Sequence, residues 1–82
     1  MNKEQIFEIV RRNIVDVLPS LSHHPIKLVD DLKSLGANSM DRMEIVVSSM
    51  EQLEVTIPLL ELAKVANIDA LVQILLDKKN VV

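Results

Sequence analysis

The apolar residues of this chain recur every three or four positions, and this periodicity restricts its fold more than any other feature. Such spacing gathers them on one face of a helix, whereas a half-buried strand alternates apolar and polar residues. Three segments follow the helical pattern, at about 3–18, about 39–54 and after Asn67. A shorter segment, 59–65, begins directly after Pro58, a residue tolerated in a first helical turn. The sequence therefore predicts an all-α fold: long helix, long loop, helix, short helix, helix.

Composition supports the helical class. Gly36 is the only glycine and Phe7 the only aromatic residue, whereas barrels and sandwiches use many turns and large cross-strand side chains. The apolar content of 49% is too high for a disordered tail. Because 82 residues suffice for one modest core and no linker is visible, we expect a single domain spanning residues 1–82.

Several classes of function are disfavoured. The chain has no cysteine, which excludes disulfides and thiolate sites, and its two histidines, His23 and His24, are adjacent in a loop, so no metal site is expected. No signal peptide or membrane span is visible, and we expect a cytoplasmic protein without a membrane partner. The net charge of −3 disfavours nucleic acid.

The negative charge is concentrated in the middle of the chain. Residues 30–61 hold seven acidic and two basic residues, a balance of −5, whereas the rest holds five acidic and seven basic residues, a balance of +2. A basic patch on a partner protein would be attracted to this middle region.

A long connection, 19–38, leads from the first helix to the second. Pro19 stops the first helix, and the segment is longer than most helix-to-helix loops. We expect one short helical turn at 30–34. Five apolar residues are expected to pin the loop to the core: Ile26, Leu28, Val29, Leu32 and Leu35.

Ser39 opens the second helix, and we expect it to be the N-cap. Gly36 permits a tight backbone approach just before it, and Asp41 lies in the first turn, where the helix dipole favours negative charge. The amides at a helix N-terminus also favour a phosphate, although Asp41 opposes one. A plain cap is the usual role of such a serine. A hydrolytic nucleophile is disfavoured, since the histidines lie fifteen and sixteen residues earlier and the chain is too small for an ordinary substrate pocket.

The second helix carries two apolar stripes. One is suited to the core and consists of Ile45, Val46, Ser49 and Leu53; the other consists of Met40, Met43, Val47 and Met50. Either the helix is central and buried on two sides, or the methionine stripe is a docking surface, since methionine adapts to varied partners.

The run 35–41 reads Leu-Gly-Ala-Asn-Ser-Met-Asp and is followed by Glu44, by an Ile57-Pro58 step and by Ala63-Lys64-Val65. This pattern resembles the acyl carrier protein family, whose usual core reads Leu-Gly-Ala-Asp-Ser-Leu-Asp. The family places its Ile-Pro step nineteen residues after the serine, which is the separation of Ser39 and Pro58 here. The resemblance covers nearly the whole chain.

The resemblance implies a four-helix bundle with a long first loop and a short third helix. It implies that a phosphopantetheinyl transferase attaches 4′-phosphopantetheine from coenzyme A to Ser39, and that acyl groups ride on the arm as thioesters. The chain would then be a carrier and not an enzyme, and a monomer is expected. Leu62 and Val65 are expected to shelter the acyl group.

The chain also departs from the family pattern. Asn38 and Met40 replace the usual aspartate and leucine, Leu59 and Leu60 follow Pro58 where many fatty-acid carriers have acids, and Met50 replaces a frequent glutamate. We therefore expect a more apolar docking surface than that of fatty-acid carriers. Its predicted residues are Met40, Asp41, Arg42, Met43, Glu44, Val47, Met50, Leu59 and Leu60.

The run 37–42 resembles free-standing donor carriers of the β-branching cassette in polyketide and antibiotic biosynthesis. That resemblance implies a malonyl or acetyl cargo and three further partners: a malonyl-loading acyltransferase, a decarboxylating ketosynthase-like protein and a hydroxymethylglutaryl (HMG) synthase-like enzyme. Arg42 is either a specificity contact or a solvated surface residue. The alternatives are a fatty-acid or peptidyl carrier, and a helical interaction adaptor without a prosthetic group.

Overall fold

The first helix is set by signals at both of its ends. The computed structural model describes residues 1–81, and in it α1 spans Lys3–Val17. Asn2 caps the helix: its side chain accepts from the amide of Gln5, whose side chain accepts in turn from the amide of Asn2. Leu18 ends the helix, and a 3-10 turn, Pro19–Leu21, follows. The helix thus has the predicted extent, whereas the 3-10 turn was not predicted.

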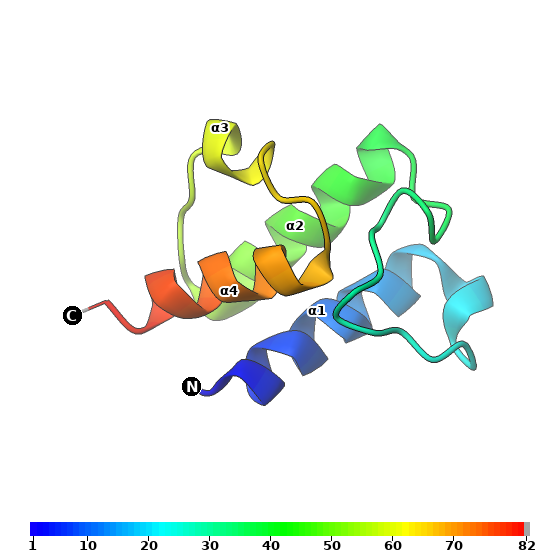
Figure 1. Ribbon diagram of the computed structural model, residues 1–82, viewed down its shortest axis with the longest axis horizontal. Helices are drawn as coiled ribbons and strands as arrows, with labels where there is room; N and C mark the ends of the chain where they lie inside the picture. Colours follow the sequence, from blue (N-terminus) through cyan, green and yellow to red (C-terminus); the bar gives the residue numbers. More distant parts are fainter. Residues whose placement is uncertain (82) are drawn as a thin grey trace.

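Three further helices complete the bundle: α2 (Ser39–Leu53), α3 (Leu59–Leu62) and α4 (Ile68–Lys79). α1, α2 and α4 pack against one another, while α3 stands apart on the α2–α4 side (Figure 1). Residues 1–81 contain no strand, so the predicted all-α class is confirmed.

Aliphatic side chains from the three long helices form the core. All four residues of the predicted core stripe of α2 are buried: Ile45, Val46, Ser49 and Leu53. Burying one such side chain contributes roughly 2 kcal/mol to folding. Asn67 caps α4 as its position predicts, because its side chain accepts from the amide of Ala70 at 2.9 Å. The fully buried aliphatic side chains are Ile6, Val10, Ile14, Ile45, Leu53, Ile68, Leu71, Val72 and Leu75.

A polar cluster lies within the α1–α2 interface. Asn13 donates from Nδ2 to Ser49 Oγ at 3.0 Å, and Ser49 Oγ donates to the carbonyl of Ile45 at 2.8 Å. Gln52 Nε2 donates to Asn13 Oδ1 at 3.1 Å. Asn13 and Ser49 are both buried. Because buried polar groups are costly without partners, this cluster favours one alignment of α1 on α2.

The long loop is anchored, but not by every residue predicted. Ile26 is buried, and Leu28, Leu32 and Leu35 pack partly buried against the core. The prediction for Val29 was wrong: its side chain is 76% exposed. The loop also supplies carbonyls to the start of α4, since the amides of residues 68 and 69 donate to those of residues 30 and 28, both at 2.9 Å. The backbone, as well as apolar burial, therefore holds the loop.

The helical turn expected at 30–34 lies at 32–36. Ala37 donates to the carbonyl of Leu32, and Gly36 donates to that of Lys33, both at 3.0 Å. This pair of bonds is a Schellman closure, which requires positive φ at the residue that Gly36 occupies, and Gly36 has φ of 105°. The only glycine thus turns the chain into α2.

α3 is shorter than the helix predicted over 59–65. It ends at Leu62, and from Lys64 on the amides bond only three residues back, Lys64 to Glu61 at 3.2 Å and Val65 to Leu62 at 3.3 Å. The apolar pattern runs on through Val65, but the backbone leaves helical geometry there to reach α4. The helix therefore covers about half of the predicted segment.

Residues near the two ends of the chain lie together. The amino group of Met1 donates to Asn80 Oδ1 at 3.3 Å, and Asn80 Nδ2 donates to the carbonyl of Met1 at 3.2 Å. The start of α1 and the end of α4 both lie toward the other end of the bundle's long axis from the start of α2 (Figure 1). Within residues 1–81, no helix is both long and apolar enough to span a bilayer.

Candidate functional site

Asn38, and not Ser39, is the N-cap of α2. The Asn38 side chain accepts from the amide of Asp41 at 2.8 Å, and Asp41 Oδ2 accepts from the amide of Asn38 at 3.1 Å. This reciprocal pair is a capping box. The prediction that Ser39 caps the helix was therefore wrong, because Asn38 has the three-residue spacing to Asp41 that the box requires. Ser39 is the first helical residue, and its hydroxyl is not needed to cap the helix.

The Ser39 hydroxyl is exposed and lies beside a guanidinium group. Arg42 donates from one terminal nitrogen to Ser39 Oγ at 3.3 Å and from the other to the carbonyl of Ala37 at 2.9 Å. A positive charge and the N-terminus of a fifteen-residue helix therefore face the same oxygen. This combination favours a phosphate ester at Ser39.

The surroundings of Ser39 do not make it a hydrolytic nucleophile. Such a serine needs a base within hydrogen-bond reach, and in the part of the chain described here its hydroxyl has one side-chain partner, Arg42, which stays protonated. Both histidines are exposed in the loop. No group of three metal-ligating side chains occurs among residues 1–81.

The methionine stripe of α2 divides into an exposed and a half-buried part. Met40 is 81% exposed and Met43 is 47% exposed, whereas Val47 and Met50 are half-buried. The interpretation of a helix buried on two sides therefore holds only for the second half of the stripe, where Met50 packs on the core. The first half faces solvent, and its use as a docking surface stays a prediction.

Exposed leucines of α3 accompany the exposed methionines, and Met43 and Leu59 line the same hollow beside Ser39. Leu59 and Leu60 of α3 are 57% and 81% exposed. We call Met40, Met43, Leu59 and Leu60 the apolar surface. Of the other residues predicted to dock partners, Glu44 is exposed, and Asp41 and Arg42 are half-buried.

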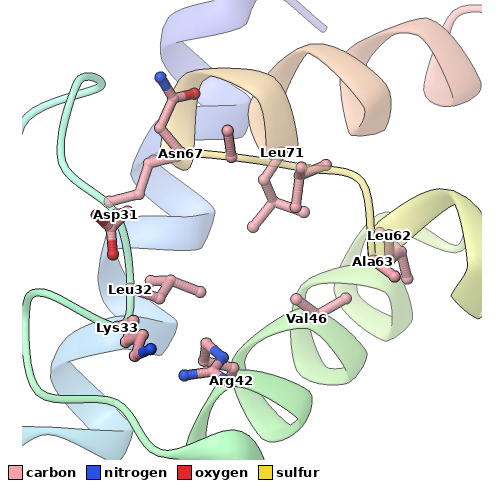
Figure 2. A pocket seen from close by; sticks show the side chains of 12 residues that line it. Asp31, Leu32, Lys33, Arg42, Val46, Leu62, Ala63, Asn67 and Leu71 are labelled. Carbon is pink, nitrogen blue, oxygen red and sulfur yellow. The ribbon is translucent and has the colours of Figure 1, made fainter.

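A groove of about 600 Å³ opens between α2, the α3–α4 connection and the long loop (Figure 2). Its apolar lining includes Val46, Leu62 and Leu71, and its polar lining includes Lys33 and Arg42. A second hollow of about 320 Å³ adjoins Ser39 and shares four lining residues with the groove: Arg42, Val46, Leu62 and Ala63. The two hollows therefore adjoin, and together their walls extend from Ser39 to Val65 and Leu71.

Both residues predicted to shelter an acyl group line this groove. Leu62 is buried and borders both hollows, while Val65 is half-buried and borders the larger one. The polar residues of the groove were not predicted. Among them is Asp31, whose pKa is held below its usual value by hydrogen bonds from the backbone and side chain of Ser34.

Three comparisons with known proteins point to the same family. The family model described as "Phosphopantetheine attachment site" matches residues 8–75. The polyketide biosynthesis acyl carrier protein AcpK of Bacillus subtilis (strain 168) is 45% identical over 78 residues, which are 95% of each chain. A chain in the crystal structure of the curacin-pathway HMG synthase in complex with its acetyl donor acyl carrier protein matches with a TM-score of 0.83 and 38% identity. That match covers 89% of this chain and 94% of the other.

Proposed function

The chain belongs to the acyl carrier protein family, whose members carry covalent 4′-phosphopantetheine, and on this basis we propose that Ser39 is the attachment residue. The observation that carries the proposal is the exposed hydroxyl, which is not used for capping and receives a hydrogen bond from Arg42. It lies within the matched segment, at the start of the helix.

The surrounding residues fit the prosthetic group. Its phosphate would lie near the α2 N-terminus and the Arg42 guanidinium, and its chain could follow the groove along Val46 and Leu62. When attached, the group supplies a thiol that holds an acyl chain as a thioester. Since the protein has no cysteine, it offers no competing thiol.

This chain's own part is to present the cargo and not to transform it. Ser39 holds the group, the capping box keeps the start of α2 ordered, and the apolar surface beside Ser39 is available to partner enzymes. A monomer that exposes this one end to several enzymes in turn fits the role. The same argument favours a carrier over an adaptor, in which Ser39 would have no chemical task.

We further propose that the protein is the acyl donor in polyketide β-branching. In this role an acyltransferase loads malonyl on the arm, a ketosynthase-like protein decarboxylates it to acetyl, and an HMG-synthase-like enzyme accepts the acetyl group. Two findings support the role: the 45% identity to a polyketide carrier and the structural match to an acetyl donor carrier crystallised with an HMG synthase. The apolar surface would contribute the hydrophobic part of the contact.

Intact mass after incubation with coenzyme A and a phosphopantetheinyl transferase tests the attachment. The wild type should gain the mass of one phosphopantetheine, and Ser39→Ala should gain none. Ser20→Ala, which removes another exposed hydroxyl, is the matched control and should be modified as fully as the wild type. An unmodified wild type, or a modified Ser39→Ala protein, contradicts the proposal.

Acetyl transfer tests the donor role. The acetyl-loaded protein should acylate an HMG synthase of a β-branching cassette much faster than a fatty-acid ketosynthase uses its malonyl-loaded form. Adding an acidic residue to the apolar surface, as in Leu60→Glu, should slow transfer to the HMG synthase while leaving phosphopantetheine attachment intact. Efficient turnover by the fatty-acid ketosynthase, with none by the HMG synthase, would identify a fatty-acid carrier instead.

A further inference from the structure

Arg42 lies between Ser39 and the groove. Its guanidinium is 3.3 Å from Ser39 Oγ, and its side chain lines both hollows. The second bond, to the carbonyl of Ala37 at 2.9 Å, fixes the guanidinium where the loop meets α2. A guanidinium held by two hydrogen bonds in this way is oriented before any ligand arrives.

Among the carboxylates of residues 1–81, none forms an ion pair with Arg42. The ion pairs found among residues 1–81 involve Lys3, Arg11 and Arg12, and none involves Arg42. The neighbouring carboxylate of Asp41 accepts from the amide of Asn38 in the capping box. That of Asp31, on the groove, accepts from Ser34. Arg42 can therefore pair with an anion placed on the oxygen it already contacts.

The groove offers a course for the chain that is attached to such an anion. Beyond Arg42 the wall continues along Val46, Leu62 and Ala63 to Val65 and Leu71. An arm that starts at Ser39 can run either outward over the exposed Met40 or inward along this wall. Arg42 borders the groove (Figure 2) and also the hollow beside Ser39, and this position favours the inward course.

We propose that Arg42 is a positioning residue that binds the phosphodiester of the group attached to Ser39 and directs the arm into the groove. Bound there, a short acyl thioester lies against Leu62 and Val65 and is shielded from water. This inference rests on the attachment proposed above. It assigns to Arg42 a role toward the protein's own prosthetic group, in addition to any contact with a partner enzyme.

The test uses protein modified on Ser39, with a nitroxide label on the arm thiol. Paramagnetic broadening of backbone amide signals reports where the label lies. In the wild type, the amides of Val65 and Ala66 should broaden more than those of Glu51 and Gln52, which lie near the other end of α2. Arg42→Gln should reduce the groove broadening about threefold, as expected for loss of a partly exposed charged contact. Lys64→Gln, an exposed cation near the groove that does not line it, should leave it unchanged.

Phosphorus NMR gives a second readout at the phosphodiester itself. Its chemical shift in Arg42→Gln should move toward that of the urea-unfolded protein, and Arg42→Lys should restore part of the native shift. Intact mass and the amide spectrum establish that each variant is modified and folded, so failed attachment is distinguished from a wrong position of the arm. Groove broadening and a phosphorus shift that are the same in Arg42→Gln and wild type would overturn the inference.

Discussion

The two sides of α2 differ in almost every physical respect, although they belong to one fifteen-residue helix. Toward α1, Ile45 and Ser49 are fully buried, and Asn13 and Gln52 complete the polar contacts. Toward α3, and at the N-terminal end, the helix exposes Met40 and opens onto a groove. Stability is concentrated on the first side, and the second is left open for ligands and partners.

The comparison teaches that a small carrier can present its proposed attachment residue, Ser39, at the start of a helix that is well packed on its other side. Because the α1 side fixes the helix, the start of α2 can expose apolar side chains without help from α3, a helix of only four residues. The first two predictions concern the buried side, the third the outer surface of α1, and the last the exposed side.

The largest loss of stability should come from Ile45→Ala. This side chain is fully buried between helices, and its truncation removes apolar contact and leaves a cavity. We expect the free energy of unfolding to fall by about 3 kcal/mol in urea titration. Phosphopantetheine attachment at a temperature where the variant is folded should remain. A loss below about 1 kcal/mol would show that the α1 side is less tightly packed than the structure indicates.

Ser49→Ala should cost about 1 kcal/mol, because it takes the acceptor from Asn13 Nδ2 while Gln52 still bonds to Asn13. Ser48→Ala is the matched control: Ser48 is half-buried on the same helix, and its removal should change the free energy of unfolding by less than about 0.5 kcal/mol. Urea titration of both proteins measures the difference. Equal changes in the free energy of unfolding of the two variants would show that the polar cluster does not stabilise the α1 side.

A smaller, pH-dependent effect is expected on the outer surface of α1. The hydrogen bond from Arg11, whose Nε lies 2.9 Å from Glu8, lowers the pKa of Glu8 from 4.5 to about 2. A lowered folded-state pKa stabilises the protein above the unfolded value, and the contribution disappears as the pH falls from about 4.5 to about 2. Glu8→Gln should therefore be slightly less stable than wild type at neutral pH, with the gap closing over that window.

The measurement for Glu8 is the difference between wild-type and Glu8→Gln stability as a function of pH, at low and high salt. Screening should shrink the gap at high salt, because the pair is exposed to solvent. A gap that widens toward acid would contradict the assigned sign.

The smallest effect on stability should come from Met40→Gln on the exposed side. Its side chain is mostly in solvent, so we expect a change in the free energy of unfolding within about 0.5 kcal/mol. Binding to an HMG-synthase-like partner should weaken nevertheless, because an apolar contact is lost. Thermal unfolding and titration calorimetry measure the two effects. A large drop in stability with unchanged binding would show that the exposed side of α2 contributes to stability and not to partner contact.

Sequence periodicity predicted most of the fold. The apolar stripes of α1, α2 and α4 matched their buried faces because core burial dominates helix orientation. The periodicity overestimated the length of α3, because an apolar pattern that continues to Val65 does not reveal where the backbone must turn toward α4. Nor could it show that Val29 is exposed, because the path of an irregular loop depends on tertiary contacts.

For the candidate site, the sequence pointed to Ser39, which the structure exposes at the start of α2, but it misassigned the cap. Asn38 and Ser39 are both good capping residues, and the signal that separates them is the three-residue spacing from Asn38 to Asp41. The Asn13–Ser49 contact joins residues 36 positions apart and has no local pattern. The position of Arg42 between Ser39 and the groove likewise required the folded backbone.

The hydrogen bonds between Met1 and Asn80 bring together the two places where a tag or a fused domain would be attached. Because the start of α1 and the end of α4 both lie toward the other end of the long axis from the start of α2, a fused domain, an affinity tag or a solid support attached beside either one points away from Ser39, the proposed attachment residue (Figure 1). A molecule immobilised at either of these positions would keep the start of α2 exposed to the solution. Enzymes could then be tested one after another on the same anchored population.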